Sequence, residues 1–138
     1  MAFPPKPEDL GFHANNFMSK VASRKAKGRR LQYWVAEKVA TLLGVTFDQQ
    51  DDTCPVHSRE MGQKGADVYI RDMELAKSFP YSIECKNTET FSIYNVIKQV
   101  KANTKEGQEW VIFHKKNHSD PVAIISAEHF FDILKKIS

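Results

Sequence analysis

Between residues 79 and 85, hydrophobic side chains occupy every second position: Phe79, Tyr81, Ile83 and Cys85. This period of two predicts a strand, because successive side chains of a strand point to opposite faces of the sheet. A second strand is predicted at residues 67–70. Residues 72–78 connect the two, so we expect them to pair as a hairpin.

A helical spacing of hydrophobic residues follows Gly28. One face of a helix over residues 29–43 would carry Leu31, Trp34, Val35, Val39, Leu42 and Leu43. Gly44 comes next, and glycine commonly ends a helix. A first long helix is therefore predicted at residues 29–43, with Trp34 and the leucines facing inward. A helix can begin as early as Ser19, with Gly28 as an interruption.

The remaining patterns predict alternating helices and strands. We expect a short strand at 45–47, a loop at 48–65, a helix at 92–104, a buried strand at 110–113, a turn at 117–121, a second buried strand at 122–125 and a terminal helix capped by Ser126. This order predicts an α/β fold, with a mixed central sheet flanked by helices.

The N-terminal residues 1–18 hold three prolines, two adjacent asparagines and no helical period. They predict an arm that precedes a single domain at 19–138, because 138 residues suffice for one hydrophobic core but not for two.

Composition excludes several classes of protein. Hydrophobic residues make up 41% and aromatic residues 11% of the chain, which excludes disorder throughout. No apolar run approaches the ~18 residues of a membrane span, and the first residues do not resemble a signal peptide. The two cysteines, Cys54 and Cys85, are few for a secreted scaffold. We therefore expect a cytoplasmic protein with reduced thiols and no membrane association.

Positive charge is concentrated in one short segment. Six basic residues fall between positions 20 and 30 without an acidic neighbour: Lys20, Arg24, Lys25, Lys27, Arg29 and Arg30. The net charge is only +3, so the rest of the chain is net acidic. This asymmetry favours contact with a polyanion such as DNA. The alternative is a solvated helix face.

Two acidic residues and a lysine are the strongest candidates for catalysis. Glu84 and Lys86 are two residues apart on the predicted strand and therefore project from the same face. Pairing of the hairpin would bring Asp67 close to Glu84. Two carboxylates beside an ammonium group can hold a divalent cation for attack on a phosphodiester. The alternative is a solvated strand face, on which such charge patterns are common.

These residues resemble the signature of the PD-(D/E)XK nuclease superfamily, in which an acidic residue precedes an acid-x-lysine on the next strand. The resemblance extends from about Lys27 to the terminal helix and implies a restriction-endonuclease-like αβββαβ core. It also implies that Asp67, Glu84 and the backbone carbonyl of Cys85 coordinate Mg²⁺ or Mn²⁺. Lys86 would orient the attacking water or offset negative charge.

Within that superfamily the chain is most similar to phage and archaeal Holliday-junction resolvases. These proteins are small and open their first helix with a Lys-Gly-Arg segment, which here is Lys27-Gly28-Arg29 followed by Arg30. The resemblance implies a homodimeric endonuclease that acts on branched DNA in DNA recombination, in the host cytoplasm if a phage encodes it. Loop residues Ser58, Arg59, Glu60 and Gln63 would then lie near the bound phosphate.

One position departs from the resolvase pattern. Such enzymes usually carry a glutamate on the first helix as a further metal ligand, where this chain has Gln32. Glu37 points about 140° away around a helix, which leaves Glu60 as a replacement and the number of metals open. Gln99 lies where related nucleases often carry a polar site residue; the alternative is an exposed helix glutamine.

Other functions also fit the sequence. Two half-sites, Cys54 with His57 and His114 with His118, have spacings that suit zinc. The same fold could serve as a DNA-binding module without cleavage, or as a restriction or repair nuclease on duplex or single-stranded DNA.

Overall fold

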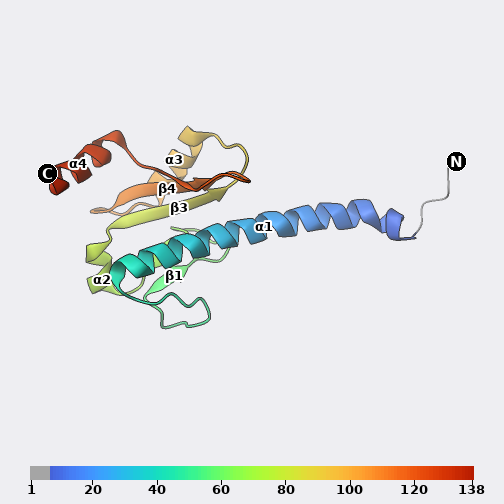
Figure 1. Cartoon of the computed structure of the whole chain (residues 1–138), viewed down its shortest axis with the longest axis horizontal. Helices are drawn as coiled ribbons and strands as arrows, with labels where there is room; N and C mark the ends of the chain where they lie inside the picture. The colour runs from blue at the N-terminus through green and yellow to red at the C-terminus, as the bar shows by residue number, and fades with distance from the viewer. Residues whose placement is uncertain (1–6) are drawn as a thin grey trace.

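A single long helix, α1 (Pro7–Leu43), runs along the molecule. The structure is a computed structural model that describes the backbone of residues 7–138 and the side chains of residues 22–138. The N-terminal half of α1 extends beyond the sheet (Figure 1). Gly44, with φ of 74°, ends the helix, and the N–H of Val45 donates to the carbonyl of Ala40 at 2.9 Å.

The predicted start of this helix was wrong. Residues 7–18, expected as an arm without helical structure, are the first turns of α1, and Gly28 does not interrupt it. One interior glycine costs a helix only about 1 kcal/mol relative to alanine, which a long helix tolerates. A side chain at Gly28 would meet the methyl group at the end of the exposed Met61 side chain at 2.8 Å, so a larger residue there would require that side chain to move. Residues 1–6 of the expected arm lie outside the described residues.

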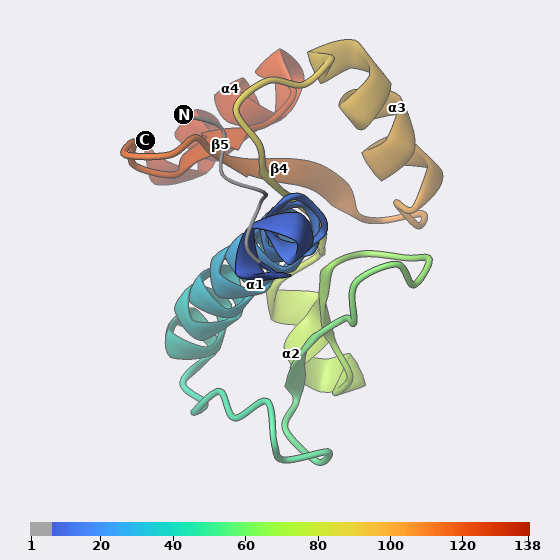
Figure 2. The same ribbon diagram turned by 90° about the vertical axis from the view of Figure 1, so that its right-hand side faces the viewer.

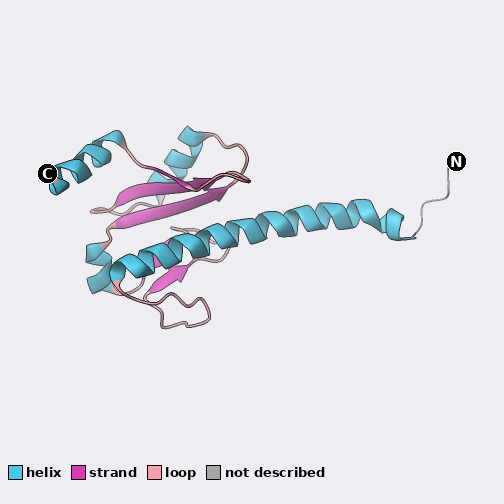
Figure 3. Cartoon of the chain, viewed as in Figure 1, coloured by secondary structure: helices cyan, strands magenta, loops and turns pink. Residues whose placement is uncertain are grey.

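Within the described residues, five strands form one sheet in the order β1-β2-β3-β4-β5. They are β1 (Val56–Ser58), β2 (Val68–Ile70), β3 (Tyr81–Asn87), β4 (Glu109–Lys115) and β5 (Val122–Ile124). β3 and β4 are parallel, and the other neighbouring pairs are antiparallel. Figure 3 shows the sheet with helices around it. The predicted α/β class with a mixed sheet is confirmed, as is the antiparallel pairing of the two hairpin strands.

Three shorter helices complete the fold: α2 (Met73–Ser78), α3 (Ile93–Ala102) and α4 (Ala127–Ile137). α3 connects β3 to β4, as a parallel pair requires a crossover. Ser126 caps α4 as predicted, because its hydroxyl accepts the N–H of His129 at 3.1 Å. None of the helices among the described residues is both long enough and apolar enough to cross a membrane.

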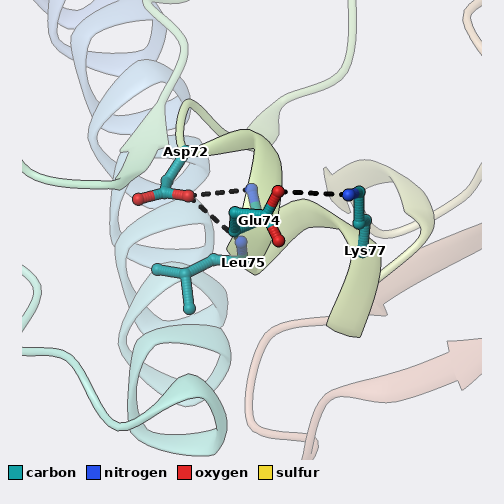
Figure 4. A network of polar contacts seen from close by, with 4 residues as sticks. All are labelled: Asp72, Glu74, Leu75 and Lys77. Atoms are coloured by element: carbon teal, nitrogen blue, oxygen red, sulfur yellow. Dashed lines mark hydrogen bonds and ion pairs between the residues drawn. The ribbon is translucent and has the colours of Figure 1, made fainter.

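The connection between β2 and β3 contains helix α2, which the sequence did not predict. Figure 4 shows its cap: one Asp72 carboxylate oxygen accepts the N–H groups of Glu74 at 2.9 Å and Leu75 at 3.2 Å. Glu74 also pairs with Lys77 at 3.1 Å. The cap satisfies N–H groups that the first turn of any helix leaves free, which stabilises this short helix.

Hydrophobic side chains pack on both faces of the sheet. Between α1 and the sheet lie Leu31, Val35, Ala36, Val39, Ala40, Val56, Val68, Ile83 and Val111. Between α3 and the opposite face lie Val96, Val100 and Ile112. The central strands β3 and β4 are therefore covered on both sides. This packing holds the two strands, and the residues at their ends, in fixed positions.

Several local predictions differ from the structure. Trp34 is 41% and Leu42 71% exposed. The buried stripe of α1 includes Leu31, Val35 and Val39, and Trp34 lies to one side of it, about 60° from Leu31 and about 140° from Val39 around the helix. Leu42 falls between Leu31 and Val35 around the helix but lies in its last turn. Residues 45–47 form no strand, whereas β1 lies inside the segment predicted as a loop. Val122, expected on a buried strand, is 52% exposed at the start of the edge strand β5.

Candidate active site

Asp67 lies where β2 begins beside the middle of β3. β2 pairs with β3 at Val68 and Ile83, so β3 continues past the start of its neighbour. The N–H of Asp67 donates to the carbonyl of Ile83 at 2.8 Å. Its carboxylate accepts the N–H of Cys85 at 2.7 Å. Asp67 directly precedes β2 and occupies the position that one more residue at the start of that strand would take. Two hydrogen bonds fix its position.

Glu84 projects from β3 toward α3 and is only 4% exposed. One of its oxygens accepts the side-chain N–H of Gln99 at 3.2 Å. The Lys86 ammonium lies 3.6 Å from the same oxygen. Lys86 and Glu84 share this face because they are two residues apart on a strand. Gln99 reaches it from α3, so two elements hold the glutamate.

Burial shapes the electrostatics of the two acids. Desolvation is the main cause that raises the pKa of Glu84 to about 7, and the Asp67 charge is the second cause, although Lys86 opposes the shift. Burial also raises the pKa of Asp67, although the hydrogen bond from the Cys85 N–H and the charges of Lys86 and Arg59 oppose this shift. Burial raises the pKa of the Cys85 thiol well above its usual value, so it remains protonated. Burial therefore disfavours the charged form of both carboxylates, and the Asp67 charge adds to this effect at Glu84, where Lys86 compensates only in part.

These side chains line one open hollow of about 470 Å³. Its walls include six of the predicted site residues: Gln32, Asp67, Glu84, Cys85, Lys86 and Gln99. Asn103 also lines it and was not predicted. The sequence could have indicated Asn103, because it follows Gln99 by four residues and so lies on the same helical face.

Gln32 is 4% exposed and bound to protein atoms on both sides. Its carboxamide oxygen accepts the Ser58 hydroxyl at 2.7 Å, and its nitrogen donates to the Met61 sulfur at 3.4 Å. Ser58 itself is 1% exposed. The Ser58 hydroxyl is thus buried against Gln32, although Ser58 also lines a hollow with Lys25 and Arg29.

Arg59 and Glu60 border a different hollow. It measures about 530 Å³, and Lys25 and Arg29 of α1 line it with them. Glu60 is not among the residues around the two carboxylates, so the structure does not bring it to the place of a replacement ligand. Gln63, by contrast, lines the hollow that holds Asp67.

The Arg59 side chain is held in place by its surroundings. Its Nε donates to the carbonyl of Ala66 at 2.8 Å, and its guanidinium carbon lies 4.5 Å from the centre of the Tyr69 ring. A side chain on Gly65 would approach that guanidinium to 2.8 Å, and Gly65 has φ of 117°, so only glycine suits this position. The loop that leads into Asp67 is thereby packed around a fixed cation.

The basic residues of α1 divide between two sides of the helix. Lys25 and Arg29 face the hollow of Arg59, whereas Lys27 and Arg30 line another hollow beside Trp34. Arg24 lines a third with Lys27. Figure 2 looks along α1, with α3, β4 and β5 on one side of it and α2 on the other. The Lys20 side chain lies outside the described part.

The zinc alternative is wrong for the described residues, in which no three His, Cys, Asp or Glu side chains converge on a metal position. His57 lies on β1 and His114 on β4. Two strands lie between β1 and β4, so these two strands are roughly 14 Å apart. His114 instead hydrogen-bonds the carbonyl of Thr88 at 2.8 Å, and the Cys54 thiol donates to the carbonyl of Thr46 at 3.5 Å.

Three comparisons, with protein-family models, curated proteins and solved structures, found no match to this chain.

Proposed function

We propose that this chain is a metal-dependent endodeoxyribonuclease that hydrolyses phosphodiester bonds, with branched DNA as its substrate. The observation that carries the proposal is the hollow in which Asp67 and Glu84 meet, with the Lys86 ammonium 3.6 Å from Glu84. A protein that only bound DNA would gain nothing from two carboxylates facing a phosphate, because like charges repel.

The residues present fit Mg²⁺ or Mn²⁺. Asp67, Glu84 and the backbone carbonyl of Cys85 would hold the ion, and hard cations prefer such oxygen ligands. Burial raises the pKa of both acids, and the Asp67 charge raises that of Glu84 further; the charge of a divalent cation would offset both effects. When bound, the ion would neutralise charge on the phosphate and lower the pKa of nearby water.

The chain's own residues position the reaction. The Cys85 N–H fixes Asp67, and Gln99 fixes Glu84, so neither carboxylate needs to reorganise when DNA binds. Lys86 is 28% exposed at its side chain, which leaves its ammonium able to reach a phosphate oxygen or an attacking water. We propose that it orients that water or stabilises the charge that develops during hydrolysis.

The arrangement of elements also supports the proposal. The order α1, β1, β2, β3, α3, β4 follows the αβββαβ order of the restriction-endonuclease-like core, with α2 inserted between β2 and β3. Cations on both sides of α1 suit a branched substrate, because its arms leave the junction in several directions.

The decisive experiment compares linear, nicked and four-way DNA substrates, with Mg²⁺ or with EDTA. Asp67→Asn and Glu84→Gln should each reduce cleavage at least ~100-fold, while binding persists or tightens because the repulsion of phosphate falls. Lys86→Ala should lose the chemical step with metal binding largely kept. Glu74→Gln, on the exposed face of α2, is the matched control. Cleavage in excess EDTA, or full activity of Asp67→Asn, would overturn the proposal.

A second candidate is a DNA-binding module that does not cleave. Gln32 favours it, because a neutral amide bonded to Ser58 and Met61 replaces the acid expected on the first helix. Binding of the four-way substrate without cleavage in Mg²⁺ or Mn²⁺ would select this candidate. Preferential cleavage of linear duplex or single strands would instead select a restriction or repair nuclease.

A further inference from the structure

A large aromatic side chain lies on the surface of α1 beside several cations. Trp34 is 41% exposed, and it borders a hollow of about 540 Å³. The Lys38 ammonium lies over its ring, 5.4 Å from the centroid. An indole of this exposure contributes little to the core, since the buried stripe of α1 runs along a different face.

The hollow is formed where three segments meet. α1 contributes Lys27, Arg30 and Trp34; the ends of the parallel strands β3 and β4 contribute Asn87 and Lys115; the turn before β5 contributes His118. None of the residues that line it is acidic. The carboxyl ends of parallel strands are a common location of ligand sites in α/β proteins, and a volume of this size suits a small ligand or one segment of a polymer.

Hydrogen bonds fix the walls of the hollow. The Asn87 side chain donates to the carbonyl of Lys27 at 3.1 Å and so ties the end of β3 to α1. The N–H of Asn117 donates to the Glu89 carboxylate at 2.8 Å, which holds the turn in place. His118 has φ of 61°, and among the described residues it is the only non-glycine with positive φ. The hollow is therefore built from anchored segments.

The chemistry of these walls matches an unpaired nucleotide. Phosphates are attracted to Lys27, Arg30 and Lys115, whereas an aromatic ring offers a stacking surface to a base. Duplex DNA keeps its bases stacked inside and needs only the cations. We propose that this hollow binds one unpaired nucleotide of DNA, with its base stacked on Trp34 and its phosphate against these cations.

This inference rests on the proposed function for the choice of DNA, and it places the nucleotide close to the proposed cleavage site. Asn87, which lines this hollow, directly follows Lys86, which lines the hollow of Asp67 and Glu84, so neighbouring residues at the end of β3 contribute to both. Unpaired nucleotides occur at branch points and at single-stranded flaps. The hollow would thus select DNA in which pairing is interrupted beside the bond to be cut.

The test measures binding in EDTA, where hydrolysis cannot interfere. The chain has two tryptophans, so Trp110→Phe leaves Trp34 as the only indole. Its emission should be quenched by an oligothymidylate single strand and much less by the same strand in a duplex. Trp34→Leu should weaken binding of the oligothymidylate roughly tenfold and change duplex binding less than twofold. Trp34→Phe should keep most of the affinity.

Leu42→Ala is the matched control, since Leu42 is also exposed on α1 but does not line the hollow. Circular dichroism verifies that each variant is folded. Equal affinity of Trp34→Leu and the unchanged chain for oligothymidylate would overturn the inference, as would equal quenching by duplex. A chain that shows the quenching but never cleaves DNA would keep this inference and lose the proposed function. Cleavage of DNA without quenching of the Trp34 emission would keep the proposed function and overturn this inference.

Discussion

Glu84 carries a carboxylate in a place that disfavours its charge. It is 4% exposed, Asp67 repels it, and Lys86 with Gln99 compensates only in part. Desolvation of an ionised group costs free energy unless partners replace the lost water. This buried carboxylate therefore destabilises the fold when it is charged.

The sign of the resulting pH dependence follows from the raised pKa. The folded chain holds the Glu84 proton more tightly than the unfolded chain, because the pKa rises from 4.5 to about 7. The free energy of unfolding should therefore fall as pH rises from about 4.5 to 7, and the loss should be complete above that range. Asp67, whose pKa is also raised, contributes in the same direction.

Glu84→Gln should abolish this contribution. In EDTA at pH 8, the variant should be more stable than the unchanged chain by about 2 kcal/mol, less than the full pKa shift implies because the hollow is open to solvent. At pH 4.5 the difference should nearly vanish. Urea unfolding at both pH values measures it. Glu74→Gln, at a side chain that is 83% exposed, should show no such pH-dependent gain. A variant that is less stable at pH 8 would contradict the argument.

At the scale of single elements, α1 both closes the core and presents cations to solvent. Its buried stripe covers the sheet, and the positions on either side of that stripe carry Lys25 with Arg29 and Lys27 with Arg30. A residue step of about 100° along a helix produces this division. A basic segment that is continuous in sequence thus becomes two separate surfaces.

Neutralising one surface should affect DNA binding in a defined way. The double variant Lys25→Gln and Arg29→Gln should weaken binding to all DNA sequences alike. The slope of log K against log salt should become shallower by about 0.9 for each phosphate that the variant no longer neutralises. Fluorescence anisotropy with labelled duplex over a range of salt concentrations measures this slope. The double variant Lys135→Gln and Lys136→Gln, in the last turn of α4, removes the same amount of charge and is the control. An unchanged slope in the first variant would show that this surface is only solvated.

At the scale of the whole molecule, α4 leaves apolar side chains in solvent. Phe130 is 47%, Leu134 44% and Ile137 78% exposed. Phe131 is 58% exposed and packs edge-on against Phe130. A contact between the Tyr81 hydroxyl and the His129 ring at 2.6 Å joins the helix to the sheet. Such a face on a terminal helix is suited to an isologous contact.

We expect a homodimer with α4 at its interface. One domain with one site cuts one strand, whereas resolution of a four-way junction needs two symmetric cuts, which a twofold pair supplies. Sedimentation equilibrium at micromolar concentration, with and without junction DNA, should show a dimer. Leu134→Ser with Ile137→Ser should weaken it at least ~10-fold, because the dimer would bury less apolar area.

Tyr94 on α3 is 80% exposed and offers an alternative apolar contact for a dimer. Tyr94→Ser should leave a dimer through α4 intact. A strict monomer in both conditions would favour a nicking or single-strand nuclease over a junction resolvase.

Local patterns in the sequence determined much of this protein. Alternation predicted β3, the spacing of Glu84 and Lys86 placed both on one face, and Ser126 marked the start of α4. Strand pairing through a short connection brought Asp67 beside them as expected. These features depend on contacts within a few residues or on one hairpin, so the periodicity of the sequence is enough to specify them.

Only the tertiary structure decided which groups meet across elements. It placed Gln99 on Glu84, tied Gln32 to Ser58, kept Glu60 away from the carboxylates and left Trp34 in solvent. It also divided the basic segment between two sides of α1. Periodicity shows that a helix has an apolar face, but several faces of α1 fit its sequence. The choice among them depends on packing against strands far away in the chain, which no local pattern records.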